Sequence, residues 1–339
     1  MSEKGLLKIL LIQTAFTGDV ILATAALEKL HRCYPEASID ILLRKGNEGL
    51  FAGHPFLNEA IVWDKKSRKL PNLLKIAGKA RRKRYDIAIN FHRFASSGIV
   101  MYLSGAKQRA GFDKNPFSFC YTHTVKHIIG DGKHEIDRNN ELIAPFCATA
   151  VFKERTLPRI YPQPADFERI AKFSTAPYIC IAPASVWFTK QFPTHKWIEF
   201  IKLLGGVYSV NLLGSGADRQ LCNSIKSSVN NNRSINNLAG ELSLLESAAL
   251  MKNAVMNYVN DSAPMHLASA VNAPVVAIFC STVPAFGFGP LSDKSFIAET
   301  KERLDCRPCG LHGRKTCPRG HFRCAETIRI DDLLNTLQR

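Results

Sequence analysis

Residues 259–290, VNDSAPMHLASAVNAPVVAIFCSTVPAFGFGP, form the stretch that decides the fold. A strand ends here and is followed by three residue types that are common in turns and at helix N-caps: Asn260, Asp261 and Ser262. The sequence then predicts a short helix over residues 265–271 and a buried strand over 274–280. A strand, a helix and a further strand in this order are typical of a parallel sheet with crossover helices.

The turn between the first strand and the helix is a candidate ligand site. Free backbone N–H groups at a helix N-terminus favour an anion, and open α/β sheets bind ligands at the carboxyl ends of their strands. Asp261, Ser262 and His266 surround this N-terminus. A capped helix that carries a buried histidine is the alternative interpretation.

Strands and helices alternate in both halves of the chain, which predicts two Rossmann-like α/β domains that face each other across a cleft. Ligands often bind at such a domain interface. A Pro-rich stretch over 157–177 marks the linker. We expect an N-terminal domain over 1–160, a C-terminal domain over 175–325 and a C-terminal helix over 326–339.

The net charge of +16 points to an anionic partner, such as nucleic acid, anionic lipid or a phosphorylated substrate. The basic excess is concentrated in residues 65–84, where no acidic residue occurs. Ten residues carry it: Lys65, Lys66, Arg68, Lys69, Lys75, Lys79, Arg81, Arg82, Lys83 and Arg84. A solvated helix face is the alternative interpretation of this run.

The chain has ten cysteines, of which six are scattered singly and are expected to act as small core residues. These six are Cys33, Cys120, Cys147, Cys180, Cys222 and Cys280. The other four follow the pattern Cys306-x2-Cys309-x7-Cys317-x6-Cys324, which suggests a structural zinc site. Free thiols or a disulfide are the alternatives.

Two further positions are candidates for chemistry. Gly18 and Asp19 follow the first strand, so Asp19 either caps the next helix or acts as a general base. Lys190 precedes a helix that begins near Pro193, and a lysine beside a helix N-terminus strengthens an anion site. A surface lysine is the alternative there.

Three segments, taken together, resemble one family. They are TAFTGDVILATAALEKLHRCYPEASID (residues 14–40), ASVWFTKQFPTHKW (184–197) and LAGELSLLESAALMKNAVMNYVNDSAPMHLASAVNAPVVAIFCSTVP (238–284). Their order and content are similar to those of the ADP-heptose:lipopolysaccharide heptosyltransferases of glycosyltransferase family 9. The tail CRPCGLHGRKTCPRGHFRC also looks like tails of some members.

The resemblance implies a GT-B type fold and an inverting transfer of heptose from ADP-heptose to the inner core of lipopolysaccharide. It implies that Asp19 is the catalytic carboxylate and that Lys190 meets the donor diphosphate. The remaining donor-site residues that it implies are Gly18, Ser185, Leu242, Asp261, Ser262, Ala263 and His266. No catalytic metal is expected, because a helix dipole and a lysine stabilise a diphosphate without one.

The location follows from what the sequence lacks. No apolar run approaches the roughly 20 residues of a membrane span, and the N-terminus does not resemble a signal peptide. We therefore expect a cytoplasmic protein. The basic run leads us to expect it on the inner face of the inner membrane, as a peripheral protein and a monomer. We expect no binding to nucleic acid, because the basic run lacks interleaved aromatic residues and no known nucleic-acid-binding module appears. The alternatives are a nucleotide-sugar epimerase of the same fold and a basic, zinc-bearing nucleic-acid-binding protein.

Overall fold

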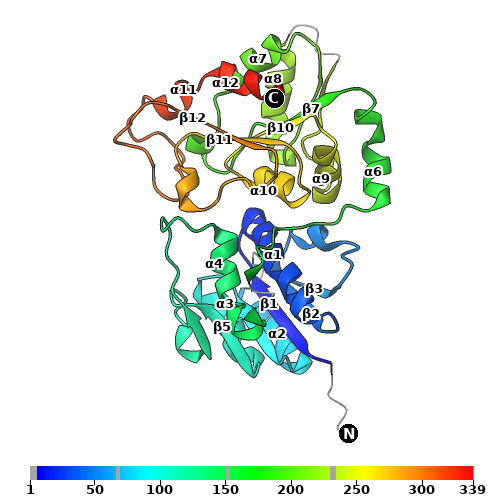
Figure 1. Ribbon diagram of the computed structural model, residues 1–339, viewed down its shortest axis with the longest axis vertical. Helices are drawn as coiled ribbons and strands as arrows, with labels where there is room; N and C mark the ends of the chain where they lie inside the picture. Colours follow the sequence, from blue (N-terminus) through cyan, green and yellow to red (C-terminus); the bar gives the residue numbers. More distant parts are fainter. Residues whose placement is uncertain (1–5, 66–68, 150–152, 230–233, 339) are drawn as a thin grey trace. The chain divides into compact units, whose positions relative to one another are not determined.

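The computed structural model describes residues 6–65, 69–149, 153–229 and 234–338. The chain divides into a first unit, Met1–Tyr161, and a second unit, Pro162–Arg339 (Figure 1). Each unit contains a six-stranded sheet whose described strand pairs are all parallel. The prediction of two Rossmann-like α/β domains is confirmed.

The sheet of the first unit has the strand order β3-β2-β1-β4-β5-β6. Its strands are β1 Lys8–Gln13, β2 Ser38–Arg44, β3 Leu57–Trp63, β4 Ile87–Asn90, β5 Gln108–Phe112 and β6 His123–Val125. Its helices are α1 Thr17–Cys33, α2 Lys69–Lys83, α3 Ala95–Ser104 and α4 Glu135–Glu141, with 3-10 turns at Glu48–Phe51, Ser118–Cys120 and Ala144–Phe146.

Strand β1 is the centre of this sheet because it pairs with β2 on one side and β4 on the other. Residues Ile9 to Gln13 are all buried, which is typical of a strand covered on both faces. The strand order reverses between β1 and β4, and the loop after β1 leads directly into α1. The first turn of α1 therefore lies at the topological switch point.

The sheet of the second unit has the order β12-β11-β10-β7-β8-β9. Its strands are β7 Tyr178–Ala182, β8 Ser209–Leu212, β9 Ile235–Asn237, β10 Met256–Asn260, β11 Val275–Phe279 and β12 Ser295–Glu299. Its helices are α6 Pro164–Ile170, α7 Thr194–Leu203, α8 Arg219–Ser227, α9 Leu244–Lys252, α10 Ala263–Ala270, α11 Arg323–Glu326 and α12 Ile330–Leu334. Its 3-10 turns are Ala171–Phe173, η5 Phe188–Lys190, Gly216–Asp218, Pro284–Phe286 and Asn335–Leu337.

The end of the chain completes the core of the second unit. Trp197, Phe200 and Tyr258 are fully buried there, together with Leu333 of α12. The hydroxyl of Tyr258 lies 3.0 Å from the hydroxyl of Thr336. The segment that contains Leu333 and Thr336 is therefore part of the core of the second unit.

Several local expectations need correction. The single helix expected over 326–339 is replaced by α11, α12 and a 3-10 turn, because Arg329 is extended and interrupts the helical path. The linker stretch over 157–177 contains α6, whose N-terminus is closed by a capping box between Gln163 and Asp166.

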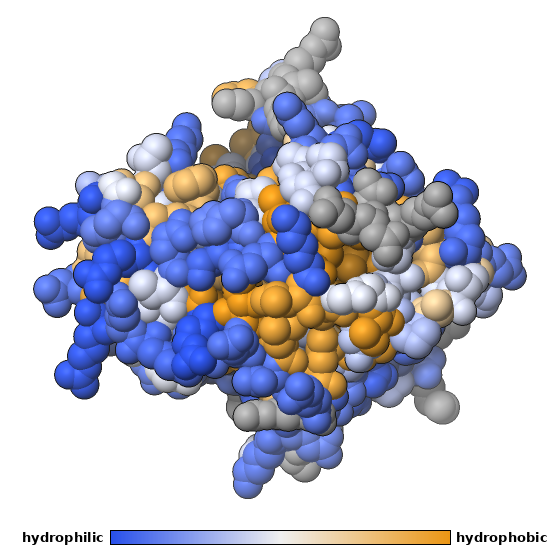
Figure 2. Space-filling model, turned by 90° about the horizontal axis from the view of Figure 1, so that it is seen from above, coloured by the Kyte–Doolittle hydropathy of each residue, from blue (hydrophilic) through white to orange (hydrophobic). Residues whose placement is uncertain are grey.

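On the face shown in Figure 2, hydrophilic side chains surround a patch of apolar residues.

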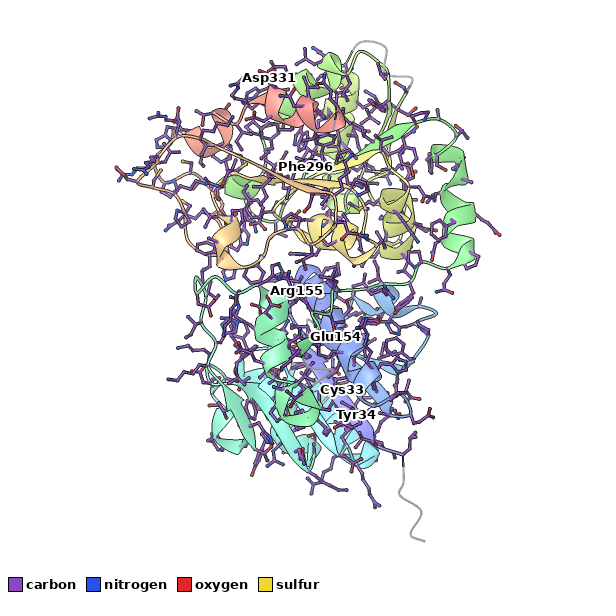
Figure 3. All side chains as sticks on the ribbon, viewed as in Figure 1. Cys33, Tyr34, Glu154, Arg155, Phe296 and Asp331 are labelled. Carbon is purple, nitrogen blue, oxygen red and sulfur yellow. A yellow bond between two sulfur atoms is a disulfide. The ribbon has the colours of Figure 1, made fainter. Side chains whose placement is uncertain are left out.

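The expectation that Cys33 and Cys147 are isolated core residues is wrong. The two form a disulfide that joins the C-terminal end of α1 to the segment after α4 (Figure 3). Both are half-buried, so neither has the closed apolar surroundings of a core thiol. Cys180, Cys222 and Cys280 are buried free thiols, as expected, whereas Cys120 is half-buried.

No helix in the described part of the chain is long and apolar enough to cross a membrane.

Candidate functional site

The turn after β10 lies at the carboxyl edge of the second sheet. Ser262 is the N-cap of α10 and has an extended backbone, and Pro264 stands in the first helical turn. In the sheet, β10 lies on one side of β7 and β8 lies on the other. The strand order therefore reverses between β7 and β10, so this too is a switch point. The N-terminus of α10 is therefore placed where an α/β sheet binds a ligand, as predicted.

Asp261 joins the loops that follow three neighbouring strands. Its carboxylate lies 2.7 Å from the ammonium of Lys190, which follows β7, and accepts a hydrogen bond of 2.6 Å from Thr282, which follows β11. The side chains of Lys190 and Asp261 are only 15% and 9% exposed. The structure thus brings two of the predicted residues into one nearly buried ion pair beside α10.

The other residues predicted in this unit lie in loops or on α10. His266 is buried on α10, and Ala263 is half-buried in its first turn. Ser185 follows β7, and its carbonyl accepts a hydrogen bond of 2.7 Å from Gln191. Leu242 is half-buried in the loop between β9 and α9. All of them lie at, or next to, the carboxyl edge of the sheet.

Asn260, which the sequence analysis assigned to the turn, is the last residue of β10, and it positions the neighbouring loop. This fully buried amide at the end of β10 donates to the carbonyl of Pro183 at 2.8 Å and accepts from the backbone N–H of Phe192 at 2.9 Å. It therefore fixes both ends of the loop that carries Lys190. A polar residue at the end of a largely apolar strand was the available signal.

Gly240 brings the loop before α9 against the Gly214–Gly216 turn. Its N–H donates to the carbonyl of Gly214 at 2.9 Å, and its φ is +76°. A Cβ at this position would lie 2.6 Å from the Cα of Gly216. Only glycine allows the two backbones to come this close. The contact connects the loops after β8 and β9 at the carboxyl edge of the second sheet.

In the first unit, Asp19 lies in the first turn of α1 and Gly18 precedes it, both half-buried. Burial raises the pKa of Asp19 to about 6, and the negative charge of Glu135 acts in the same direction. Backbone hydrogen bonds from Phe16 and from Asp19 itself, together with the charge of Arg93, oppose the rise. A carboxylate with this pKa is suited to general-base chemistry near neutral pH.

A buried charged network that the sequence analysis missed neighbours Asp19. Glu135 accepts a hydrogen bond of 2.8 Å from Arg138 and lies 3.5 Å from His127. His127 in turn lies 3.3 Å from the guanidinium of Arg93. Burial would raise the pKa of Glu135, but the hydrogen bonds and charges of His127 and Arg138 lower it, so Glu135 stays ionised.

A second polar cluster lies at the ends of β1, β3 and β4. The ammonium of Lys65 donates to the hydroxyl of Thr14 at 2.9 Å, and that hydroxyl lies 3.1 Å from Nδ1 of His92. Burial and the charge of Arg44 lower the pKa of Lys65 to about 8, while burial and nearby cations lower that of His92 to about 3. His92 is therefore neutral at pH 7, beside a cation.

The basic run over 65–84 is less uniform than its sequence indicates. Lys79 pairs with Glu59, and Lys83 pairs with Glu59 and with Asp40, so these two lysines hold α2 on the sheet. Among the cations of the run whose side chains the structure describes, four are exposed: Lys75, Arg81, Arg82 and Arg84. Lys66 and Arg68 lie outside the described residues, as does the side chain of Lys69.

The cysteine cluster has no ready metal geometry. Among the described residues, no group of three His, Cys, Asp or Glu side chains is arranged to hold an ion. Cys306, Cys309, Cys317 and Cys324 are all free thiols, and the sulfur of Cys306 lies 3.8 Å from Nε2 of His321. The expectation of zinc thus stays a prediction.

Relatives of known identity match both units. The sequence profile of glycosyltransferase family 9 (heptosyltransferase) matches residues 73–315, more than half of the chain. Lipopolysaccharide heptosyltransferase 2 of Escherichia coli K12 is 26% identical over 306 residues, which cover 86% of this chain and 87% of that protein.

Two solved structures have the same fold. The E. coli ADP-heptose lipopolysaccharide heptosyltransferase II gives a TM-score of 0.78 at 23% identity, covering 98% of this chain and 99% of that one. A family 9 glycosyltransferase from Veillonella parvula gives 0.84 at 19% identity, covering 98% and 96%. These likenesses confirm the predicted GT-B type fold. The match over most of the chain establishes that the protein belongs to glycosyltransferase family 9, the heptosyltransferases, and is a glycosyltransferase.

Proposed function

We propose that the protein is an inverting heptosyltransferase that moves heptose from ADP-heptose to the inner core of lipopolysaccharide. The Lys190–Asp261 pair at the N-terminus of α10 is the observation that carries the proposal. A diphosphate leaving group needs positive charge and N–H donors, and this edge of the second sheet offers a lysine and a helix N-terminus.

Donor binding would give Lys190 a phosphate oxygen as an additional partner. Asp261 holds the ammonium close to the helix N-terminus, and Asn260 fixes the loop from which it projects. Lys190 has three N–H donors, so it can contact a phosphate oxygen and keep Asp261 as a partner. The helix, Lys190 and Ser262 would stabilise the charge that develops on ADP as it leaves.

Asp19 supplies the base in this proposal. The acceptor hydroxyl attacks the anomeric carbon, its proton passes to the carboxylate of Asp19, and the bond to the diphosphate breaks on the opposite face of the sugar. The new glycosidic bond therefore has inverted configuration. A pKa of about 6 leaves Asp19 ionised at pH 7 and basic enough to accept the proton.

Cations near Asp19 suit an anionic acceptor. Arg93 acts electrostatically on Asp19, and Lys65 lies at the ends of the strands that precede α1 and α3. Such cations would bind an acceptor that carries acidic sugars or phosphates. Acceptor recognition by the first unit is part of the proposal.

Attachment to the membrane surface is proposed for α2. Its outer face exposes Leu70 and Leu74, at 70% and 57%, beside Lys75, Arg81 and Arg82. A helix that presents leucines and cations together is typical of a membrane interface. We further propose that the protein acts as a cytoplasmic monomer at the inner face of the inner membrane.

One assay tests this function against the two alternatives. The protein is incubated with ADP-heptose and a heptose-free lipopolysaccharide acceptor, and ADP release, the mass of the product and its anomeric configuration are measured. Transfer with inversion supports the proposal, and ADP-glucose serves as the control donor. Isomerised sugar without acceptor would indicate an epimerase, and salt-sensitive DNA binding without transfer would indicate a nucleic-acid-binding protein.

A further inference from the structure

Lys190, which the proposed function assigns to the donor diphosphate, is held at its ammonium end by Asp261. The two charged groups lie 2.7 Å apart, and Asp261 is itself fixed by a hydrogen bond of 2.6 Å from Thr282. A lysine carries its charge on a flexible four-carbon stem, so a contact at the tip leaves the path of the stem open. The contacts of the stem and of the backbone therefore decide how firmly the charge is placed.

The backbone end of Lys190 is held through its neighbour Thr189. The N–H of Thr189 donates to the carbonyl of Arg314 at 3.1 Å, and the N–H of Arg314 donates to the hydroxyl of Thr189 at 2.8 Å. The same hydroxyl accepts a hydrogen bond of 3.0 Å from Ser281, which lies just after β11. Thr189 and Ser281 are each 1% exposed, so these hydrogen bonds are shielded from water. Arg314 belongs to the cysteine-rich loop, residues 306–324.

The stem of Lys190 lies against Gly313 of the same loop. Gly313 has a φ of +77°, and a Cβ there would lie 2.9 Å from Cγ of Lys190 and 3.1 Å from the hydroxyl oxygen of Thr189. A side chain at position 313 would therefore displace the lysine stem, the threonine or both. Glycine leaves the space that the stem occupies.

The first part of the cysteine-rich loop is fixed to the end of β11. The guanidinium of Arg307 donates to the carbonyl of Cys280 at 2.8 Å and to that of Thr282 at 2.9 Å. The N–H of Cys309 donates to the carbonyl of Ser281 at 2.7 Å. The loop is thus anchored on the residues that also reach Thr189 and Asp261.

The last part of the loop rests on the turn that carries Lys190. The ring of Phe322 stacks on the ring of Phe188, with 5.1 Å between the centroids and 28° between the planes. Phe188 is the first residue of η5, and Lys190 is the last. The loop therefore contacts this turn at two places, Arg314 and Phe322, so a displacement of the loop would displace the turn.

These contacts close a circuit around Lys190. From its ammonium the circuit runs through Asp261 and Thr282, and from its backbone it runs through Thr189 and Ser281. Ser281 and Thr282 are consecutive, so the two routes meet just after β11. A side chain held at its tip, stem and backbone has little rotamer freedom left to lose when a ligand binds.

We infer that Thr189 and Gly313 are positioning residues for Lys190. Thr189 fixes the backbone from which the lysine projects, and Gly313 fixes the path of its stem. Both act through Lys190, and the cysteine-rich loop is thereby part of the donor site. The role of Lys190 toward the diphosphate rests on the proposed function, whereas its placement by these two residues does not.

The chemical reactivity of Lys190 tests the inference without any donor. Each variant is treated briefly with an amine-acylating reagent, and mass spectrometry measures the modification of Lys190 relative to that of the exposed Lys294. The side chain of Lys190 is 15% exposed and ion-paired, so it should react slowly in wild type. Thr189→Val and Gly313→Ala should raise its relative rate severalfold. Thr189→Ser keeps the hydroxyl and should stay near wild type.

Gly310→Ala is the matched control for Gly313→Ala. Gly310 lies in the same loop and has a φ of +79°, so alanine strains the backbone about equally at both positions. A Cβ at position 310 would have no atom of the described residues within 4 Å, its chain neighbours aside, whereas one at 313 would meet Lys190. Only Gly313→Ala should therefore change the labelling of Lys190. Equal labelling in the two variants would overturn the role of Gly313.

ADP affinity, measured by calorimetry, is the second test, and this arm alone rests on the proposed function. Thr189→Val should weaken ADP binding about tenfold, the effect of losing one or two hydrogen bonds that position Lys190. Thr189→Ser should restore most of the affinity. In a Lys190→Ala background, Thr189→Val should cause no further loss, because it acts only through the lysine.

Each arm has its own contrary result. Labelling of Lys190 at the wild-type rate in both Thr189→Val and Gly313→Ala would overturn the inference. An equal loss of ADP affinity from Thr189→Val with and without Lys190 would also overturn it, since Thr189 would then support the site in general. If Thr189→Val does not fold, as circular dichroism would show, Gly313→Ala carries both tests. Wild type that does not bind ADP, or Lys190→Ala that binds it normally, would contradict the proposed function, while the labelling result would stand.

Discussion

Asp19 combines two properties that usually exclude each other. It lies in the first turn of a helix, where a carboxylate is stabilised, yet burial and Glu135 raise its pKa to about 6. A residue that only capped α1 would gain from a low pKa. The raised pKa favours the general base over the cap.

Replacing Asp19 by asparagine separates these roles. The amide side chain would keep the shape and the capping ability of the carboxylate but could not accept a proton. We expect transfer to fall by about 10²–10⁴, the usual cost of losing a general base, with ADP affinity within a few-fold of wild type. Steady-state kinetics and calorimetry measure the two effects. Retained activity would leave Asp19 as a helix cap.

The pH profile provides a second test at this scale. Only the ionised carboxylate accepts a proton, so kcat should fall as the pH decreases through about 6. Glu135→Gln removes a charge that raises the pKa of Asp19, so the acid limb should move to lower pH. Arg93→Gln removes an opposing charge and should move the limb to higher pH. Shifts in the same direction for both variants would contradict the assignment.

The same pKa predicts a stability change. The folded pKa of Asp19 lies above its unfolded value of 3.8, so the carboxyl destabilises the fold as the pH rises through this window. Above pH 6 the penalty is complete, on the order of 1–3 kcal/mol. Asp19→Asn should therefore raise the unfolding free energy at pH 8, and the difference should vanish near pH 4. Denaturant titrations at the two pH values measure this difference. A lower unfolding free energy of the variant than of wild type at pH 8 would show that Asp19 acts as a stabilising helix cap instead.

At the scale of elements, the donor site depends on the loops after β7, β10 and β11. Lys190 and Asp261 come from two of them and meet at 2.7 Å. We expect Lys190→Ala to weaken ADP binding roughly 10- to 100-fold, since hydrogen bonds to charged groups contribute about 1.5–3 kcal/mol. Asp261→Ala should weaken it as well, because it leaves Lys190 without its orienting partner.

A double-mutant cycle measures the connection between the two residues. Because they are in contact, the double variant should lose less ADP affinity than the two single losses combined. Lys294→Ala, at an exposed lysine elsewhere in the second unit, is the control and should bind ADP normally. Additive effects would mean that the ion pair does not matter for the donor.

Elements differed in how far the sequence could predict them. Strands β1 and β7 and the turn after β10 were predictable, because apolar runs and turn residues are local signals. Short edge strands such as β6 and β9 were not predictable, because three residues are too few to show an alternating pattern and their pairing depends on strands far along the chain. The Glu135 network and the Asn260 contacts were missed for the same reason, since they join positions that only the fold brings together.

At the scale of the whole molecule, the cations that give the net charge of +16 are unevenly distributed. Lys79 and Lys83 are neutralised within the first unit, whereas Lys75, Arg81, Arg82 and Arg84 remain exposed. Each cation near an anionic membrane contributes on the order of 1 kcal/mol. We expect the protein to bind anionic vesicles, to ignore neutral ones and to be released by high salt.

Two charge-matched variants test whether α2 is responsible. Lys75, Arg81, Arg82 and Arg84 replaced together by Ser should lose vesicle binding and raise the KM for a membrane-embedded acceptor, with the ADP-heptose KM unchanged. Lys202, Lys294, Arg303 and Arg319 replaced by Ser remove the same charge from the exposed surface of the second unit. Equal losses in both variants would show that net charge alone, and not α2, attracts the vesicles.

The bond between Cys33 and Cys147 closes a covalent ring, because 114 positions separate the two cysteines along the chain. Strands β2 to β6 and helices α2 to α4 all lie on that ring. A single proteolytic cut anywhere between the two cysteines would therefore leave one molecule, which comes apart into two fragments only after reduction. Electrophoresis of nicked protein with and without a thiol reagent would thus reveal whether a given preparation carries the ring open or closed.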